Sequence, residues 1–131
     1  MKQIIIDLDG TLTIDSKCDY EDKPINTKVL KQIRYYKDLG FKIVIFTSRN
    51  MRTYKGDVKK IQTYTLPIII DWLKKNDVPY DDIIIGKPWC GFDGFYVDDK
   101  AIRPSEFVKK TYDEILEILK TENPHKDGGN R

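Results

Sequence analysis

Short apolar runs recur along this chain and are separated by segments with helical spacing. Residues 2–6 and 41–46 are largely apolar on both sides, as strands are when both faces of a parallel sheet are covered. Two shorter apolar runs, at 83–85 and 95–97, are each followed by polar residues and predict two further strands. The pattern therefore predicts four short buried strands.

Three helices are predicted between and after these strands. The first begins after Asn26, a good N-cap, and ends before Gly40, which suits the position just past a helix end. The second is expected over 66–75 with Thr65 as its cap. The third is expected to begin at Pro104 and to carry one apolar stripe to its end.

Alternating strands and helices predict an α/β protein with a mainly parallel sheet and right-handed crossovers. We expect a Rossmann-like, three-layer α/β/α fold. The length of 131 residues predicts one domain, which we place at 1–120, with a flexible tail at 121–131. Polar loops at 15–24 and 49–62 are the two local candidates for gating a site.

Composition excludes several classes of protein. The net charge of +2 gives no reason to expect a nucleic-acid partner. No apolar run approaches the roughly 20 residues that span a bilayer, so no membrane partner is expected. Cys18 and Cys90 are too few for a disulfide framework, and the chain begins with a strand pattern, so we expect a cytoplasmic protein.

Polar side chains follow every predicted strand. The carboxyl ends of parallel strands lie at one edge of a sheet, where ligands bind in open α/β folds. A buried strand that ends in two carboxylates needs a metal ion or a cationic neighbour to offset their charge. The side chains expected at this edge are Asp7 and Asp9 after the first strand, Thr47, Ser48 and Arg49 after the second, Lys87 after the third, and Asp98 and Asp99 after the fourth.

These residues resemble the motifs of the haloacid dehalogenase-like superfamily of aspartate-nucleophile phosphatases. DLDGT at 7–11 matches the first motif, Thr47 (or Ser48) the second, Lys87 the third and the Asp98-Asp99 pair the fourth. The chain also resembles small phosphatases encoded in bacterial capsule polysaccharide loci. That narrower resemblance is carried by TSRNM at 47–51, GKPWCG at 86–91, DGFYVDD at 93–99 and AIRP at 101–104.

The superfamily resemblance implies a role for each motif residue. Asp7 would attack phosphorus and form an aspartyl-phosphate, which splits one difficult step into two. Asp9 would protonate the leaving alcohol and later activate water. Thr47 would donate to a phosphate oxygen, and Lys87 would neutralise charge on Asp7 and on the phosphate. The implied enzyme is a phosphoric monoester hydrolase.

The resemblance also implies a Mg²⁺ cofactor, which prefers oxygen ligands. Asp7 would contribute a carboxylate oxygen, Asp9 its backbone carbonyl, and Asp98 a carboxylate. Asp99 would support the metal, or would only cap the next turn.

Four residues are predicted to bind substrate: Gly10, whose turn would pass under the phosphate, Ser48, Arg49 and Arg52. For the basic residues after the second strand, a solvated charge run is an equally good interpretation.

The intervals between motifs leave no room for a cap domain, so we expect an open cleft. Such a cleft suits a phosphate on a small molecule or a larger glycan, and it leaves open a homo-oligomer in which a neighbouring subunit supplies a lid. The subgroup resemblance implies a phosphorylated carbohydrate or capsule polysaccharide precursor as substrate. The alternatives are a phosphoaspartate receiver-like signalling module, disfavoured by motif order, and a catalytically inactive binding protein, disfavoured because every motif keeps its reactive group.

Overall fold

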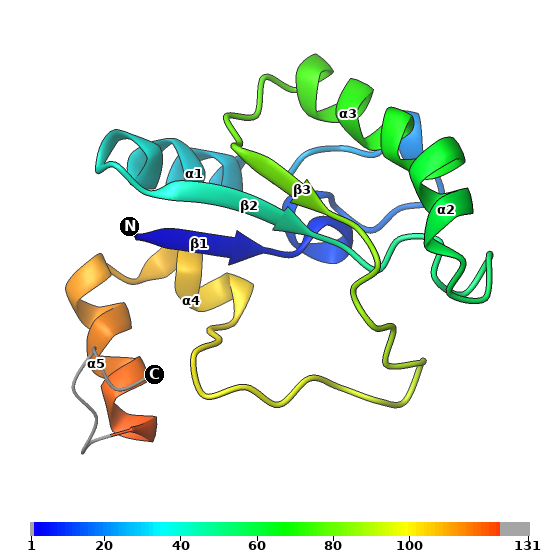
Figure 1. Ribbon diagram of the computed structural model, residues 1–131. Helices are drawn as coiled ribbons and strands as arrows, with labels where there is room; N and C mark the ends of the chain where they lie inside the picture. The colour runs from blue at the N-terminus through cyan, green and yellow to red at the C-terminus, as the bar shows by residue number, and fades with distance from the viewer. Residues whose placement is uncertain (1, 124–131) are drawn as a thin grey trace. The chain divides into compact units, whose positions relative to one another are not determined.

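The computed structural model describes residues 2–123 and contains a parallel sheet of three strands (Figure 1). The strands are β1 (Gln3–Ile6), β2 (Lys42–Phe46) and β3 (Asp82–Ile84), in the order β1-β2-β3. Ile4 pairs with Ile43 across β1 and β2, and both neighbouring pairs run parallel. The predicted α/β class and its parallel sheet are confirmed.

The chain divides into two compact units, residues 1–89 and 90–131. The first unit holds the whole sheet. A single domain at 1–120 stays a prediction. Helical structure continues to Glu122, and most of the predicted tail, 124–131, lies outside the described residues.

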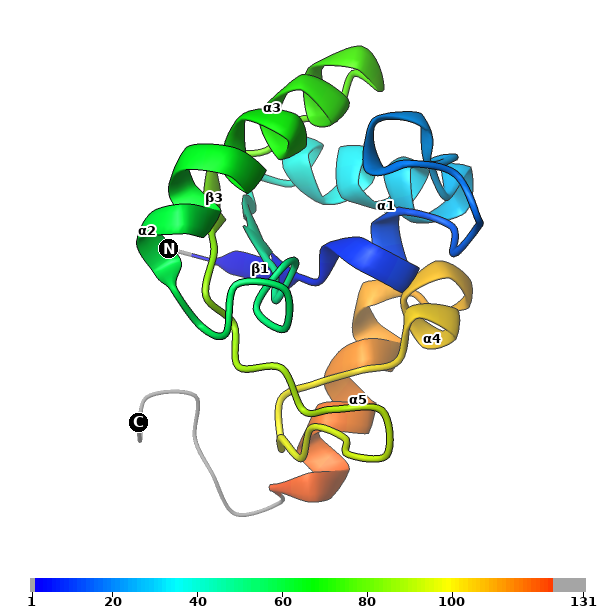
Figure 2. The same cartoon turned by 90° about the vertical axis from the view of Figure 1, so that its right-hand side faces the viewer.

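Helix α1 (Thr27–Asp38) joins β1 to β2 and follows its predicted signals closely. The Asn26 side chain accepts a hydrogen bond from the Val29 backbone N–H at 3.3 Å. Gly40, just beyond the helix, has a φ of +91°, a conformation that side chains other than glycine rarely adopt. Both crossovers, through α1 and α3 (Leu66–Lys75), place their helices on one side of the sheet (Figures 1 and 2).

The helical segment before β3 begins earlier than predicted. It starts with α2 (Val58–Lys60), whose cap is Asp57, and continues through a π-helical turn (Ile61–Thr65) into α3. The prediction that Thr65 caps α3 was wrong, because Thr65 is itself helical and its side chain makes no cap hydrogen bond. It lies in a buried stripe whose members are four residues apart. That stripe consists of Ile61, Thr65, Ile69 and Leu73.

Two sequence predictions in the second unit were also wrong. The last helix is two helices, α4 (Pro104–Lys109) and α5 (Tyr112–Glu122), because Lys110 is extended and Thr111 caps α5 by accepting from the Glu114 N–H. Residues 95–97 form no strand, since no other described strand pairs with them. No helix in the described part of the chain is long and apolar enough to cross a membrane.

We expect Asp81→Asn to lower the melting temperature by a few degrees at neutral pH. Asp81 precedes β3, accepts a hydrogen bond from the Ile43 N–H at 2.7 Å, and contacts the Lys37 ammonium at 2.9 Å. The Ile43 hydrogen bond, followed by Lys37, holds the pKa of Asp81 below its ordinary value of 3.8. The stabilisation is complete above that ordinary value and is lost as pH falls through the lower folded-state pKa.

Thermal unfolding of both proteins from pH 7 down to strongly acidic buffer measures this effect. The difference should shrink at the acidic end, where both proteins carry a neutral group at this position. Asp71→Asn, which changes an exposed carboxylate on α3, is the control and should show no such trend. A difference that stays constant with pH would mean that the Asp81 charge contributes nothing.

Candidate active site

The segments that follow β2 and β3 stay side by side beyond the sheet. The Thr47 N–H donates to the Ile84 carbonyl at 3.0 Å, and the Lys87 N–H donates to the Thr47 carbonyl at 3.1 Å. This continued pairing brings Lys87 towards the end of β1, where its ammonium lies 3.5 Å from Asp7 Oδ1. The predicted meeting of residues from all three strands at one edge is therefore present in the first unit.

A tight turn after β1 holds both of its carboxylates. Gly10 adopts a φ of +80°, and no atom lies within 4 Å of the position of an added Cβ, so backbone conformation and not space requires glycine here. The Thr11 hydroxyl donates to Asp7 Oδ2 at 3.0 Å. Thr13 accepts from the Gly10 N–H and lies 3.5 Å from Asp9 Oδ1. The turn fixes the two carboxylates while their side chains stay about one-third exposed.

Thr47 is buried at the end of β2. Its hydroxyl oxygen accepts a hydrogen bond from the Arg49 backbone N–H at 3.1 Å. Because a hydroxyl has one proton and two lone pairs, that proton stays available to donate. Ser48, half-buried, begins the turns of the following loop, where its carbonyl accepts from the Met51 N–H.

Arg49 forms a two-pronged ion pair with Asp9. Arg49 Nε lies 2.9 Å from Asp9 Oδ2, and Nη2 lies 2.7 Å from Oδ1. The arginine side chain is fully buried, and the Tyr20 ring centroid lies 4.1 Å from its guanidinium carbon. Sequence reasoning missed this pair, since no local pattern links residues 40 positions apart. The predicted contact of Arg49 with substrate stays a prediction.

The remaining predicted residues, Arg52, Asp98 and Asp99, make contacts of their own. Arg52 is exposed, and its guanidinium carbon lies 5.8 Å from the Trp89 ring centroid. Asp98 and Asp99 belong to the second unit. There Asp98 accepts from the Lys100 N–H at 2.8 Å, and Asp99 accepts from the Asn123 side-chain amide at 2.6 Å. Their metal-binding roles stay predictions.

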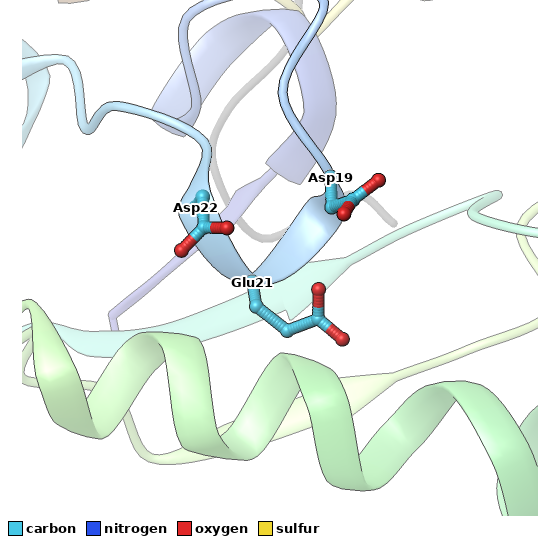
Figure 3. Close-up of side chains that lie close together, drawn as sticks. All are labelled: Asp19, Glu21 and Asp22. Carbon is cyan, nitrogen blue, oxygen red and sulfur yellow. The ribbon is translucent and has the colours of Figure 1, made fainter.

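A second acidic group, which sequence reasoning did not single out, lies in the turn before α1 (Figure 3). Its members are the exposed residues Asp19, Glu21 and Asp22, whose ligand atoms lie within 4.8 Å of one another. Asp22 also lies 3.8 Å from the Lys75 ammonium. Exposed carboxylates often gather without an ion, and no further feature of the described residues indicates one here.

The fold and this cluster together define an α/β protein with a charged, partly exposed site at the carboxyl edge of a parallel sheet. The chain belongs to the haloacid dehalogenase-like hydrolase family, whose model matches residues 4–127. It is therefore a member of a hydrolase family, as the motifs predicted. Its relationship to the capsule subgroup stays a prediction.

Two solved structures are similar to this chain. A structural-genomics crystal structure from Vibrio cholerae is 55% identical, with a TM-score of 0.91, and the match covers 93% of this chain and 99% of that one. A chain in the structure of the Pnkp1/Rnl/Hen1 complex is 22% identical with a TM-score of 0.49, and the match covers 83% of this chain and 34% of that one. No curated protein matches the chain.

Proposed function

We propose that this chain is a magnesium-dependent phosphomonoesterase that forms an aspartyl-phosphate on Asp7. The supporting observation is the state of the Asp7 carboxylate, which is one-third exposed at the sheet edge and is held between the Thr11 hydroxyl and the Lys87 ammonium. A carboxylate held in one orientation and open to a substrate is suited to in-line attack on phosphorus.

The proposed reaction has two steps. An Asp7 oxygen forms a bond to phosphorus while the ester oxygen leaves as an alcohol, taking a proton from Asp9. Water then attacks the phosphorus of the aspartyl-phosphate and gives a proton to Asp9, which releases inorganic phosphate and restores both carboxyl groups. No net proton or electron is left over.

Other residues of the edge stabilise charge on the transferring phosphate. Thr47 has a hydroxyl proton to donate, and Lys87 places a cation beside Asp7. Because phosphoryl transfer depends mainly on positioning and charge neutralisation, each such contact is expected to lower the barrier. Gly10 and Ser48 complete the proposed phosphate-binding turns.

The donors at this site fit Mg²⁺, because they are hard oxygen atoms. Asp7 Oδ1 has a contact of 3.5 Å to Lys87, at the outer limit of a hydrogen bond, so it keeps capacity to bind a cation. Asp7 and the Asp9 carbonyl would hold the ion, and the metal-binding roles of Asp98 and Asp99 stay predictions. When bound, Mg²⁺ would neutralise charge on the phosphate oxygens.

The substrate class rests on the subgroup resemblance, which favours a phosphorylated carbohydrate or capsule polysaccharide precursor. Arg52, exposed beside Trp89, offers a cation for an additional anionic group. Membership of a hydrolase family disfavours a receiver-like signalling module.

Phosphate release from a panel of sugar phosphates, nucleotide-linked phosphates, phosphorylated glycans and aryl phosphates tests the proposal. We expect catalytic release that requires added Mg²⁺ and is lost in Asp7→Asn. A chain that releases no phosphate from any of these esters, or whose release survives Asp7→Asn, would contradict it. Preference for nucleotide-linked over sugar phosphates would overturn the substrate class while leaving the chemistry intact.

A further inference from the structure

Two hydrogen bonds join the Arg49 guanidinium to the Asp9 carboxylate and fix the orientation of that carboxylate. We propose that Arg49 is a positioning residue, which fixes the Asp9 carboxylate for proton transfer, and that Tyr20 holds Arg49 in place. This inference rests on the proposed function, because it concerns the residue that would exchange protons with the leaving alcohol and with water.

The hydrogen bonds of Asp9 leave one of its oxygens partly open. A carboxylate has about four lone-pair positions. Oδ1 faces Arg49 Nη2 at 2.7 Å and the Thr13 hydroxyl at 3.5 Å, whereas Oδ2 faces only Arg49 Nε at 2.9 Å. The side chain is one-third exposed, so the carboxylate stays open to a substrate, and Oδ2 is the oxygen with the fewer hydrogen bonds. The structure thus assigns proton transfer to Oδ2.

The Arg49 side chain is held in one position by its contacts with Asp9 and Tyr20. Its side chain is fully buried, and its backbone N–H is bonded to the Thr47 hydroxyl. Nη1 is buried without a hydrogen-bond partner among the described residues, so the guanidinium depends on its pair with Asp9 and on the facing Tyr20 ring. A planar fork with two bonds to one carboxylate fixes orientation as well as distance.

Tyr20 comes from the 15–24 loop, which is attached to the rest of the first unit at its far end. The Lys23 carbonyl accepts from the Trp72 indole N–H at 2.8 Å, and the Pro24 carbonyl accepts from the Ile14 N–H at 2.8 Å. The Tyr20 side chain remains 37% exposed, so its replacement leaves no buried cavity. This loop therefore contributes one ring that covers the guanidinium, and its predicted gating role stays a prediction.

A series of aryl phosphates that differ only in the para substituent tests the inference. p-Nitrophenolate is a good leaving group and departs without a proton. Phenolate and p-methoxyphenolate are poorer leaving groups, so their departure depends more strongly on a proton from the general acid. Tyr20→Ala and Arg49→Lys should therefore lower kcat/KM for phenyl phosphate by about tenfold more than for p-nitrophenyl phosphate, within the ~10²–10⁴-fold that a general acid contributes. Tyr20→Phe keeps the ring and should restore the wild-type ratio. Tyr35→Ala, which removes an exposed tyrosine from α1, is the matched control.

A double-mutant cycle separates positioning from general support of the fold. If Arg49 acts through Asp9, Arg49→Lys should cost little further activity in an Asp9→Asn background. Equal losses on every aryl phosphate, or additive losses in the cycle, would overturn the inference while leaving the phosphatase intact. Wild-type protein that releases no phosphate from the whole series would overturn both the inference and the proposed function.

Discussion

Replacing Asp7 by Asn is expected to reduce phosphate release to less than a few per cent of the wild-type rate. An amide is not a nucleophile, so the covalent intermediate cannot form on this residue. The amide oxygen can still accept the Thr11 hydroxyl bond, and Lys87 stays 17% exposed, so its ammonium remains partly solvated when the partner charge is lost. The fold should therefore tolerate the change.

The measurement combines steady-state turnover with thermal unfolding and with trapping of radiolabelled phosphoenzyme after acid quench. Wild-type protein should retain label that Asp7→Asn lacks, while the melting temperatures stay close. Asp15→Asn, an exposed carboxylate in the adjacent loop, is the matched control and should keep both activity and label. Labelling that persists in Asp7→Asn would assign the covalent step to another residue.

Elements with strong local signals could be predicted from sequence. Asn26 and Gly40 mark the two ends of α1 because their effects are exerted within one helical turn. Thr65 was misread for the same reason: its preference for a cap position is local, but burial in the stripe that begins at Ile61 keeps it inside the helix. Tertiary packing overrode the local preference there.

The candidate site likewise has a part that the sequence could predict and a part that it could not. The rule that ligands bind at the carboxyl ends of parallel strands predicted the approach of Lys87 to Asp7 across 80 positions, because backbone topology alone produces it. The pair between Arg49 and Asp9 depends on side-chain rotamers and on a ring from a separate loop, and no spacing rule contains that information. A charge run in sequence could therefore not distinguish a solvated arginine from a buried one.

Asp9→Asn should slow turnover by about 10²–10⁴-fold, the usual contribution of a positioned acid and base. Unlike Asp7→Asn, it should also destabilise the fold. The new amide can accept one Arg49 N–H, but its NH₂ group faces the other, so a buried guanidinium loses half of its pairing. We expect a loss of about 1–3 kcal/mol, less than the ~3–5 kcal/mol for a fully buried pair, because Asp9 is one-third exposed.

The two substitutions should have the opposite order of effect on Mg²⁺ affinity: Asp7→Asn should weaken it more than Asp9→Asn. Asp7 is proposed to bind the ion through its side chain and Asp9 through its backbone carbonyl, which the substitution leaves in place. Calorimetric titration with Mg²⁺ should therefore show strongly weakened binding in Asp7→Asn and nearly wild-type binding in Asp9→Asn, measured well below the melting temperature of each. Equal losses of affinity would show that the Asp9 side chain itself reaches the ion. The pair with Arg49 would then have to open on metal binding, since both carboxylate oxygens already face the guanidinium.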